Sequence, residues 1–111
     1  NTVSPPPELG ALADIASDML RRALDTLGQG DAEGARHVCA DDGQADQLED
    51  RVLEKLQERM IAEPASVPAR VQFILVARNL ERVADLATNV AEEAIFVAQA
   101  RVIKHHREDP V

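Results

Sequence analysis

The sequence has 111 residues, which suits one domain and leaves no room for a second independent core. It contains two Phe, no Tyr and no Trp, so aliphatic residues and alanine supply the apolar content, a balance that favours packed helices over a β-sandwich or barrel. The formal net charge of −8 opposes non-specific binding to nucleic acid and to an anionic membrane surface.

Neither a disulfide nor a membrane span is predicted. Cys39 is the only cysteine, and no apolar run approaches the roughly 20 residues that a bilayer requires. We therefore expect a soluble domain in the cytoplasm. The chain opens with Asn1 and soon reaches a Pro5-Pro6-Pro7 run that is typical of a linker, so we expect it to be half of a protein about twice as long.

The first periodic segment predicts an amphipathic helix at about 8–27. Gly28 and Gly30 provide a stop, and Asp31 is a suitable cap for the segment that follows. The apolar residues at helical spacing are Leu9, Leu12, Ala16, Met19, Leu20, Ala23 and Leu27.

Two further helices are predicted, at about 32–61 and about 68–105. Pro64 and Pro68 separate them, because proline disfavours helix in the preceding residue and lacks a donor. A polar tail runs from His105 to Asp109. The stripe of the second helix holds Ala35, Val38, Ala45, Val52, Leu53, Leu56 and Met60, and that of the third holds Phe73, Val76, Ala77, Leu80, Ala84, Ala87, Ala91, Ala94 and Ala98.

The short connections predict how these helices pack. Helices joined by a few residues lie antiparallel, so we expect an all-α, up-down-up three-helix bundle. At about 1.5 Å per residue the two later helices would be roughly 45 to 55 Å long. Helices of that length leave much of their lateral surface exposed, which favours binding to a partner protein.

Acidic residues interrupt the apolar stripe of the second helix. At about 100° per residue, Asp42 and Glu49 project near its centre, and Asp46 lies on its shoulder one turn from Asp42. A carboxylate that faces a core is costly unless it is paired or bound to a cation.

The third helix carries a matching acidic face of Glu81, Asp85 and Glu92, with Asn89 beside it. Together with the second-helix acids, Glu81 and Asp85 would supply oxygen ligands for a hard or borderline cation. The alternative is that these acids line a solvated groove and pair with Arg78 and Arg82.

No catalytic constellation stands out in the sequence. His37, His105 and His106 do not form the Glu-x-x-His pattern of di-iron carboxylate enzymes, and Cys39 lacks a His and Asp set that would activate it. We therefore predict a binding domain and not an enzyme.

One motif resembles a known family. The segment from Phe73 to Phe96, and within it Asn79-Leu80-Glu81-Arg82-x-Ala84-Asp85-x-Ala87-Thr88-Asn89-x-Ala91-Glu92, closely resembles the last helix of PhoU proteins, the cytoplasmic regulators of bacterial phosphate uptake. Upstream, Asp18-Met19-Leu20-x-x-Ala23-Leu24-Asp25 and Val38-Cys39-Ala40-x-Asp42 look like the second half of that family.

The resemblance implies a fold and a metal site. PhoU proteins contain two copies of a three-helix bundle, and many bind iron clusters or other metals through (Glu/Asp)-x-x-x-Asp pairs. That pattern falls here on Asp42/Asp46 and Glu81/Asp85, with Asn89 as a further ligand, and the implied metal is an iron cluster or Fe, Mn or Mg. The sequence departs from the family at Gly43-Gln44-Ala45, where a more acidic motif is usual, and at Leu86, where His is usual.

The resemblance also implies a function and partners. The implied function is negative regulation of phosphate uptake. The implied partners are the phosphate ABC transporter and its sensor histidine kinase. The protein is implied to be a homodimer that reaches the membrane only through those partners. Two alternatives stay open: an accessory domain of another ion transporter, and a metal-carboxylate enzyme of the helical-bundle class.

Overall fold

A computed structural model describes residues 2–108, and these residues form helices joined by short connections. The elements are α1 (Pro7–Gln29), α2 (Ala32–Ala40), α3 (Asp42–Ala62), the short 3-10 helix η1 (Pro64–Ser66) and α4 (Val67–Glu108). No strand occurs within residues 2–108, and the predicted all-α class is confirmed.

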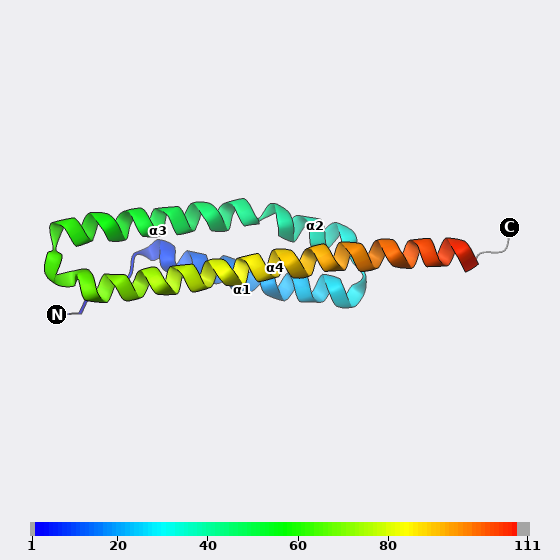
Figure 1. The fold of residues 1–111 in the computed structure, drawn as a ribbon, viewed down its shortest axis with the longest axis horizontal. Coiled ribbons are helices and arrows are strands. Elements are labelled where there is room, and N and C mark those ends of the chain that lie inside the picture. Colours follow the sequence, from blue (N-terminus) through cyan, green and yellow to red (C-terminus); the bar gives the residue numbers. More distant parts are fainter. Residues whose placement is uncertain (1, 109–111) are drawn as a thin grey trace.

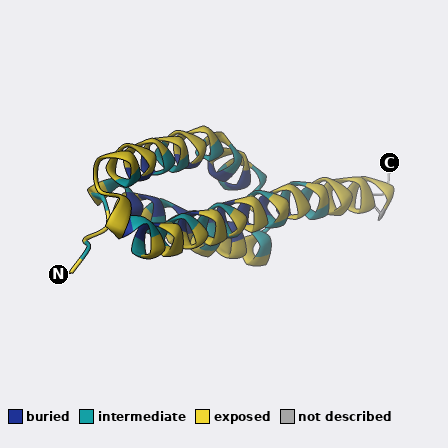
Figure 2. Ribbon diagram, turned by 60° about the vertical axis from the view of Figure 1, so that its left-hand side comes forward, coloured by how far each residue is buried: buried dark blue, intermediate teal, exposed yellow. Residues whose placement is uncertain are grey.

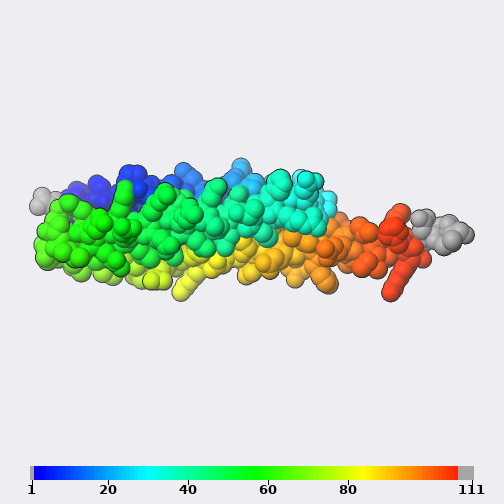
Figure 3. All heavy atoms as spheres, turned by 90° about the horizontal axis from the view of Figure 1, so that it is seen from above, coloured from blue at the N-terminus to red at the C-terminus, as the bar shows by residue number. Residues whose placement is uncertain are grey.

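The helices form one long rod. α1 runs in one direction, α2 and α3 return beside it, and α4 runs back alongside all three (Figure 1). The rod measures 73 × 18 × 16 Å. The C-terminal part of α4 extends past the end that α1 and α2 form, as the view from above also shows (Figure 3).

The connection between α1 and α2 follows the predicted stop and cap. Gly30 adopts a left-handed conformation (φ 66°), and its backbone N–H donates to the carbonyl of Thr26. The Asp31 side chain then accepts a hydrogen bond of 2.9 Å from the Gly34 N–H, which caps α2. A side chain at Gly34 would collide with Asp31, so this tight cap requires glycine there.

The predicted second helix is two helices, which corrects the expectation of one helix at about 32–61. The break lies at Asp41, whose N–H donates to the Val38 carbonyl at 3.1 Å. Its side chain accepts a hydrogen bond from Arg22 of α1, which also binds Asp18. A tertiary contact from α1 therefore accompanies the break, and the apolar periodicity of the sequence did not reveal it.

The core lies where α1, α2 and α3 meet α4 (Figure 2). Larger side chains from the first three helices, including Leu12, Met19 and Leu56, pack against a row of alanines on α4. The prediction that Val76 belongs to this row is wrong, since Val76 is exposed and its neighbour Ala77 is buried. The buried α4 alanines are Ala77, Ala84, Ala87, Ala91 and Ala94.

A buried cation, Arg70, lies beside the predicted break, in the first turn of α4. Glu63 is extended (φ −135°), and the Ser66 hydroxyl donates to its carbonyl at 2.7 Å. Arg70, whose side chain is only 8% exposed, donates from Nε to Ser66 Oγ at 2.8 Å and pairs with Glu63 at 3.5 Å. Sequence analysis gave no role to Arg70.

The far end of α4 continues beyond the predicted limit near residue 105. The helix extends to Glu108, and Asp109 of the expected polar tail lies outside the described residues. Among the helices of residues 2–108, none is both long enough and apolar enough to cross a membrane.

Candidate functional site

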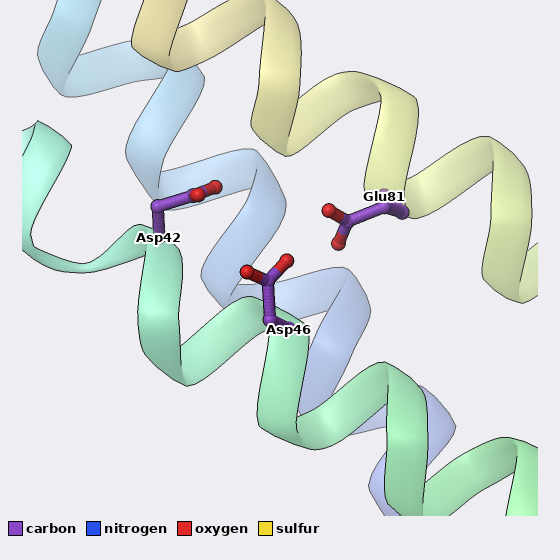
Figure 4. Close-up of side chains that lie close together, drawn as sticks. All are labelled: Asp42, Asp46 and Glu81. Atoms are coloured by element: carbon purple, nitrogen blue, oxygen red, sulfur yellow. The ribbon is translucent and has the colours of Figure 1, made fainter.

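Three carboxylates from two helices converge beside the core. Asp42 and Asp46 of α3 face Glu81 of α4, and one oxygen of each side chain lies within 4.8 Å of the others. Their carboxylates point toward one another across the gap between the two helices (Figure 4). We call Asp42, Asp46 and Glu81 the carboxylate group.

The fold explains why these residues meet. Asp42 is the first residue of α3, directly after the break at Asp41, and Asp46 follows one turn later on the same face. α4 passes this face in the opposite direction, with Glu81 opposite the two aspartates. On each helix a buried alanine lies close in sequence to these acids, Ala45 on α3 and Ala84 on α4.

The carboxylate group is electrostatically strained. Burial raises the pKa of Glu81 to about 8, helped by a hydrogen bond with Asp46 and by the charges of Asp46, Asp85 and Glu49. Burial also raises the pKa of Asp42, with a further contribution from the charges of Asp46 and Asp85. Acidic groups therefore gather here, and Glu81 keeps its proton at neutral pH.

Two oxygens of the group lack a protein partner. Asp42 Oδ1 and Glu81 Oε2 are buried, and no donor among the described residues reaches either. Two ionised carboxylates can only accept hydrogen bonds, so Glu81 and Asp46 can bond to each other only when one of them holds a proton. A proton or a cation satisfies such a group, and three carboxylate oxygens fit a hard divalent cation.

The comparisons with known proteins decide the family. The PhoU domain matches residues 9–94, which is most of the chain and includes the whole carboxylate group. The chain belongs to the PhoU family. The expected resemblance is thereby confirmed.

Several curated PhoU homologues are similar over most of this chain. The "Phosphate-specific transport system accessory protein PhoU homolog" of Zymomonas mobilis is 30% identical, over 90% of this chain and 42% of its own length. A second such homologue, from Thermotoga maritima, is 29% identical, over 96% of this chain and 46% of its own. The chain thus spans less than half the length of these relatives. No solved structure matches the chain significantly.

The remaining ligands predicted for this PhoU domain, Asp85 and Asn89, do not belong to the carboxylate group. Asp85 is exposed and outside the group, although its charge raises the pKa of Glu81 and Asp42. Asn89 is exposed as well. Neither Arg78 nor Arg82 forms an ion pair with an acid of α3 or α4 within residues 2–108, so the alternative of acids paired with these arginines is not what the structure shows.

Two further residues belong to the surroundings of the group. Burial raises the pKa of Glu49, and the nearby positive charge of Arg78 partly opposes this rise. Burial also raises the pKa of the Cys39 thiol, as do the charges of Glu92 and Asp42. A protonated thiol is a poor nucleophile, and no sequence pattern had linked Cys39 to these acids.

Proposed function

We propose that this chain is a regulatory, non-enzymatic domain of a phosphate-transport accessory protein. The observation that carries the proposal is the PhoU match over residues 9–94, together with relatives whose names assign them to the phosphate-specific transport system. The domain would lower phosphate uptake by binding the transporter on the cytoplasmic side.

The partners we propose are the phosphate ABC transporter and its sensor histidine kinase, contacted by a homodimer. The flanks of the long helices supply the contact surface. α4 in particular exposes large apolar side chains on its outer face, including Leu75 and Leu86, which contribute little to the core of this bundle.

The carboxylate group is proposed to hold iron, manganese or magnesium. Asp42, Asp46 and Glu81 would be its ligands, with Asp85 and Asn89 at the exposed rim. A bound cation supplies positive charge that neutralises the three carboxylates. The cation would then link Asp42 and Asp46 of α3 to Glu81 of α4, and no proton would have to be shared between the carboxylates.

Phosphate uptake in cells tests the regulatory role. Uptake is measured in cells that lack the gene for the protein, before and after the protein is restored, with sulfate uptake as the control. We expect restoration to lower phosphate uptake and to leave sulfate uptake unchanged. An effect on another ion alone would favour the alternative of a different transporter. Oxidase or hydrolase turnover by iron-loaded protein would favour the enzyme.

Calorimetric titration tests the metal site separately. Mn²⁺, Mg²⁺ and Fe²⁺ are each added to the wild type and to a variant with Asp46→Asn and Glu81→Gln. We expect heat of binding with the wild type and none with the double variant, since two of the three ligands become neutral amides. The matched control is Asp50→Asn with Glu93→Gln, two exposed acids on the same helices. Equal heat from both variants would contradict the assignment.

A further inference from the structure

The side of α4 that faces away from the other helices is exposed along its length (Figure 2). Five large apolar side chains lie on it, each between 39% and 67% exposed: Val71, Leu75, Leu86, Phe96 and Ile103. At about 100° per residue they fall within an arc of about 100°, which we call the outer face of α4. A continuous row of exposed apolar residues marks a contact with another molecule.

The charged residues of the outer face are ordered by sign. Arg78 and Arg82 precede Leu86, and Glu92 and Glu93 follow it. All four charged side chains are exposed, and none of them forms an ion pair within residues 2–108. The outer face is therefore basic before Leu86 and acidic after it.

Two further exposed charges lie along the same stretch of α4. Asp85 is next to Leu86, at the edge of the outer face. Arg101 packs over Gly30, on another side of the helix. Neither changes the order of basic residues first and acidic residues second.

The outer face is symmetrical about Leu86 in the kind of residue it carries. The two arginines precede Leu86 by 4 and 8 residues, and the two glutamates follow it by 6 and 7. Beyond the charges, apolar residues lie 11 and 15 residues before Leu86 and 10 and 17 residues after it: Leu75 and Val71, then Phe96 and Ile103. Charged and apolar residues thus give the same centre.

This order selects a second copy of the chain in antiparallel orientation. A two-fold axis beside Leu86 places the arginines of each copy opposite the glutamates of the other, and Leu86 against its own copy. A parallel copy would oppose like charges instead, which is unfavourable. An anionic membrane would meet Glu92 and Glu93 as well as the arginines, and so it complements only half of the face.

The outer face is long enough for a specific contact. Ile103 follows Val71 by 32 residues, which corresponds to about 48 Å along the helix. Over a width of about 10 Å, that of one helix, two copies cover roughly 1,000 Å² in total. This area is near the lower limit for specific protein interfaces, so we expect a dimer that dissociates at micromolar concentrations.

We propose that two copies of this chain associate through the outer face of α4, in antiparallel orientation about Leu86. Arg78 and Arg82 of each copy pair with Glu92 and Glu93 of the other, and the apolar residues at the two ends of the face cover one another. The inference rests on the homodimer of the proposed function and identifies its interface.

Sedimentation equilibrium of the chain tests the charge pairing. An acidic variant, Arg78→Glu with Arg82→Glu, and a basic variant, Glu92→Arg with Glu93→Arg, should each associate at least about tenfold more weakly, because like charges then meet. A variant with all four substitutions should associate as the wild type does. Ten residues, about 15 Å, separate Arg82 from Glu92 on one helix, so this rescue requires pairing between copies.

Substitutions at the centre of the face test the position of the axis. Leu86→Gln should weaken association at least about tenfold, since Leu86 meets its own copy. Asp85→Asn should strengthen association, because Asp85 lies beside the axis and approaches its own copy.

Matched controls lie on the other helices. Leu24→Gln removes an apolar residue of α1 that is 53% exposed, close to the 50% of Leu86. Arg36→Glu with Arg51→Glu, at exposed positions of α2 and α3, gives the same net charge as the acidic variant. Circular dichroism verifies that every variant is folded. The controls should associate as the wild type does.

The possible failures can be told apart. A chain that stays monomeric at millimolar concentration would overturn this interface and the homodimer together. A dimer that the acidic, basic and Leu86→Gln variants form as well as their controls would overturn the interface and leave the homodimer. Weak association of the variant with all four substitutions would overturn the antiparallel arrangement. The uptake experiment tests the transporter role independently of these results.

Discussion

Charged side chains join α3 to α4 at two places, and the two places differ in how their charge is compensated. At the connection between the helices, Arg70 is buried but donates to Ser66 and pairs with Glu63. In the carboxylate group, Asp42 and Glu81 each keep a buried oxygen that no donor within residues 2–108 reaches. Removal of one partner from a compensated buried charge is strongly destabilising.

Buried charge without a protein partner, as in the carboxylate group, is unfavourable until a proton or a cation binds. The three carboxylates repel one another, and burial and neighbouring acids raise the pKa of Glu81 to about 8. Strongly perturbed groups of this sort gather at functional sites. The comparison therefore separates a charged contact with protein partners from the site proposed for a cation.

Removal of the compensated cation should have the largest effect. Arg70→Met keeps the apolar stem but loses the charged hydrogen bond to Ser66, so we expect the free energy of unfolding to fall by about 2 kcal/mol. Urea denaturation measures this. Arg78→Met, at an exposed position on the same helix, should change it by less than about 0.5 kcal/mol. Equal losses of the free energy of unfolding in the two variants would mean that the bond to Ser66 gives Arg70 no special role in stability.

The carboxylate group should respond in the opposite direction. Glu81→Gln removes one charge, and its amide can donate to Asp46, so without metal it should raise the free energy of unfolding at pH 8 by about 1 kcal/mol. Urea denaturation with a chelator present measures the change. Glu93→Gln, an exposed acid on the same helix, is the control and should have almost no effect.

The pH dependence of stability sharpens this result. Glu81 titrates near its ordinary value of 4.5 when unfolded and at about 8 when folded, so the folded state holds its proton more tightly. The stability that Glu81 contributes by binding this proton is complete below pH 4.5 and is lost as the pH rises toward 8. The wild-type melting temperature should fall over this range more than that of Glu81→Gln. Parallel curves would contradict the raised pKa.

The smallest effect is expected at Glu63. Its carboxylate pairs with Arg59 and Arg70 but is about half exposed, so solvent screens both pairs. Glu63→Gln should lower the free energy of unfolding by about 0.5 kcal/mol, because the amide oxygen still accepts from Arg70. A loss as large as that of Arg70→Met would mean that the ion pair, and not the bond to Ser66, holds the connection.

Local signals in the sequence were sufficient for the all-α class and for the connections after α1 and before α4, but not for the break at Asp41. The periodic apolar residues, Gly30 with Asp31 and the two prolines after residue 62 each act within a turn or two of the chain. Such signals do not depend on the partner helix, and so the all-α class and both connections could be predicted. The motif around Glu81 also led to the correct family, because its residues are consecutive.

Only the tertiary structure decided which charged residues matter together. Asp41, at the break, accepts a hydrogen bond from Arg22 of another helix, and the buried Arg70 donates to Ser66 of the connection. The spacing of Asp42, Asp46, Glu81 and Asp85 treats the four alike, yet antiparallel packing brings oxygens of the first three within 4.8 Å of one another and leaves Asp85 outside this group. Helical period fixes which face a residue occupies, but the rotation and offset of two packed helices decide which faces meet.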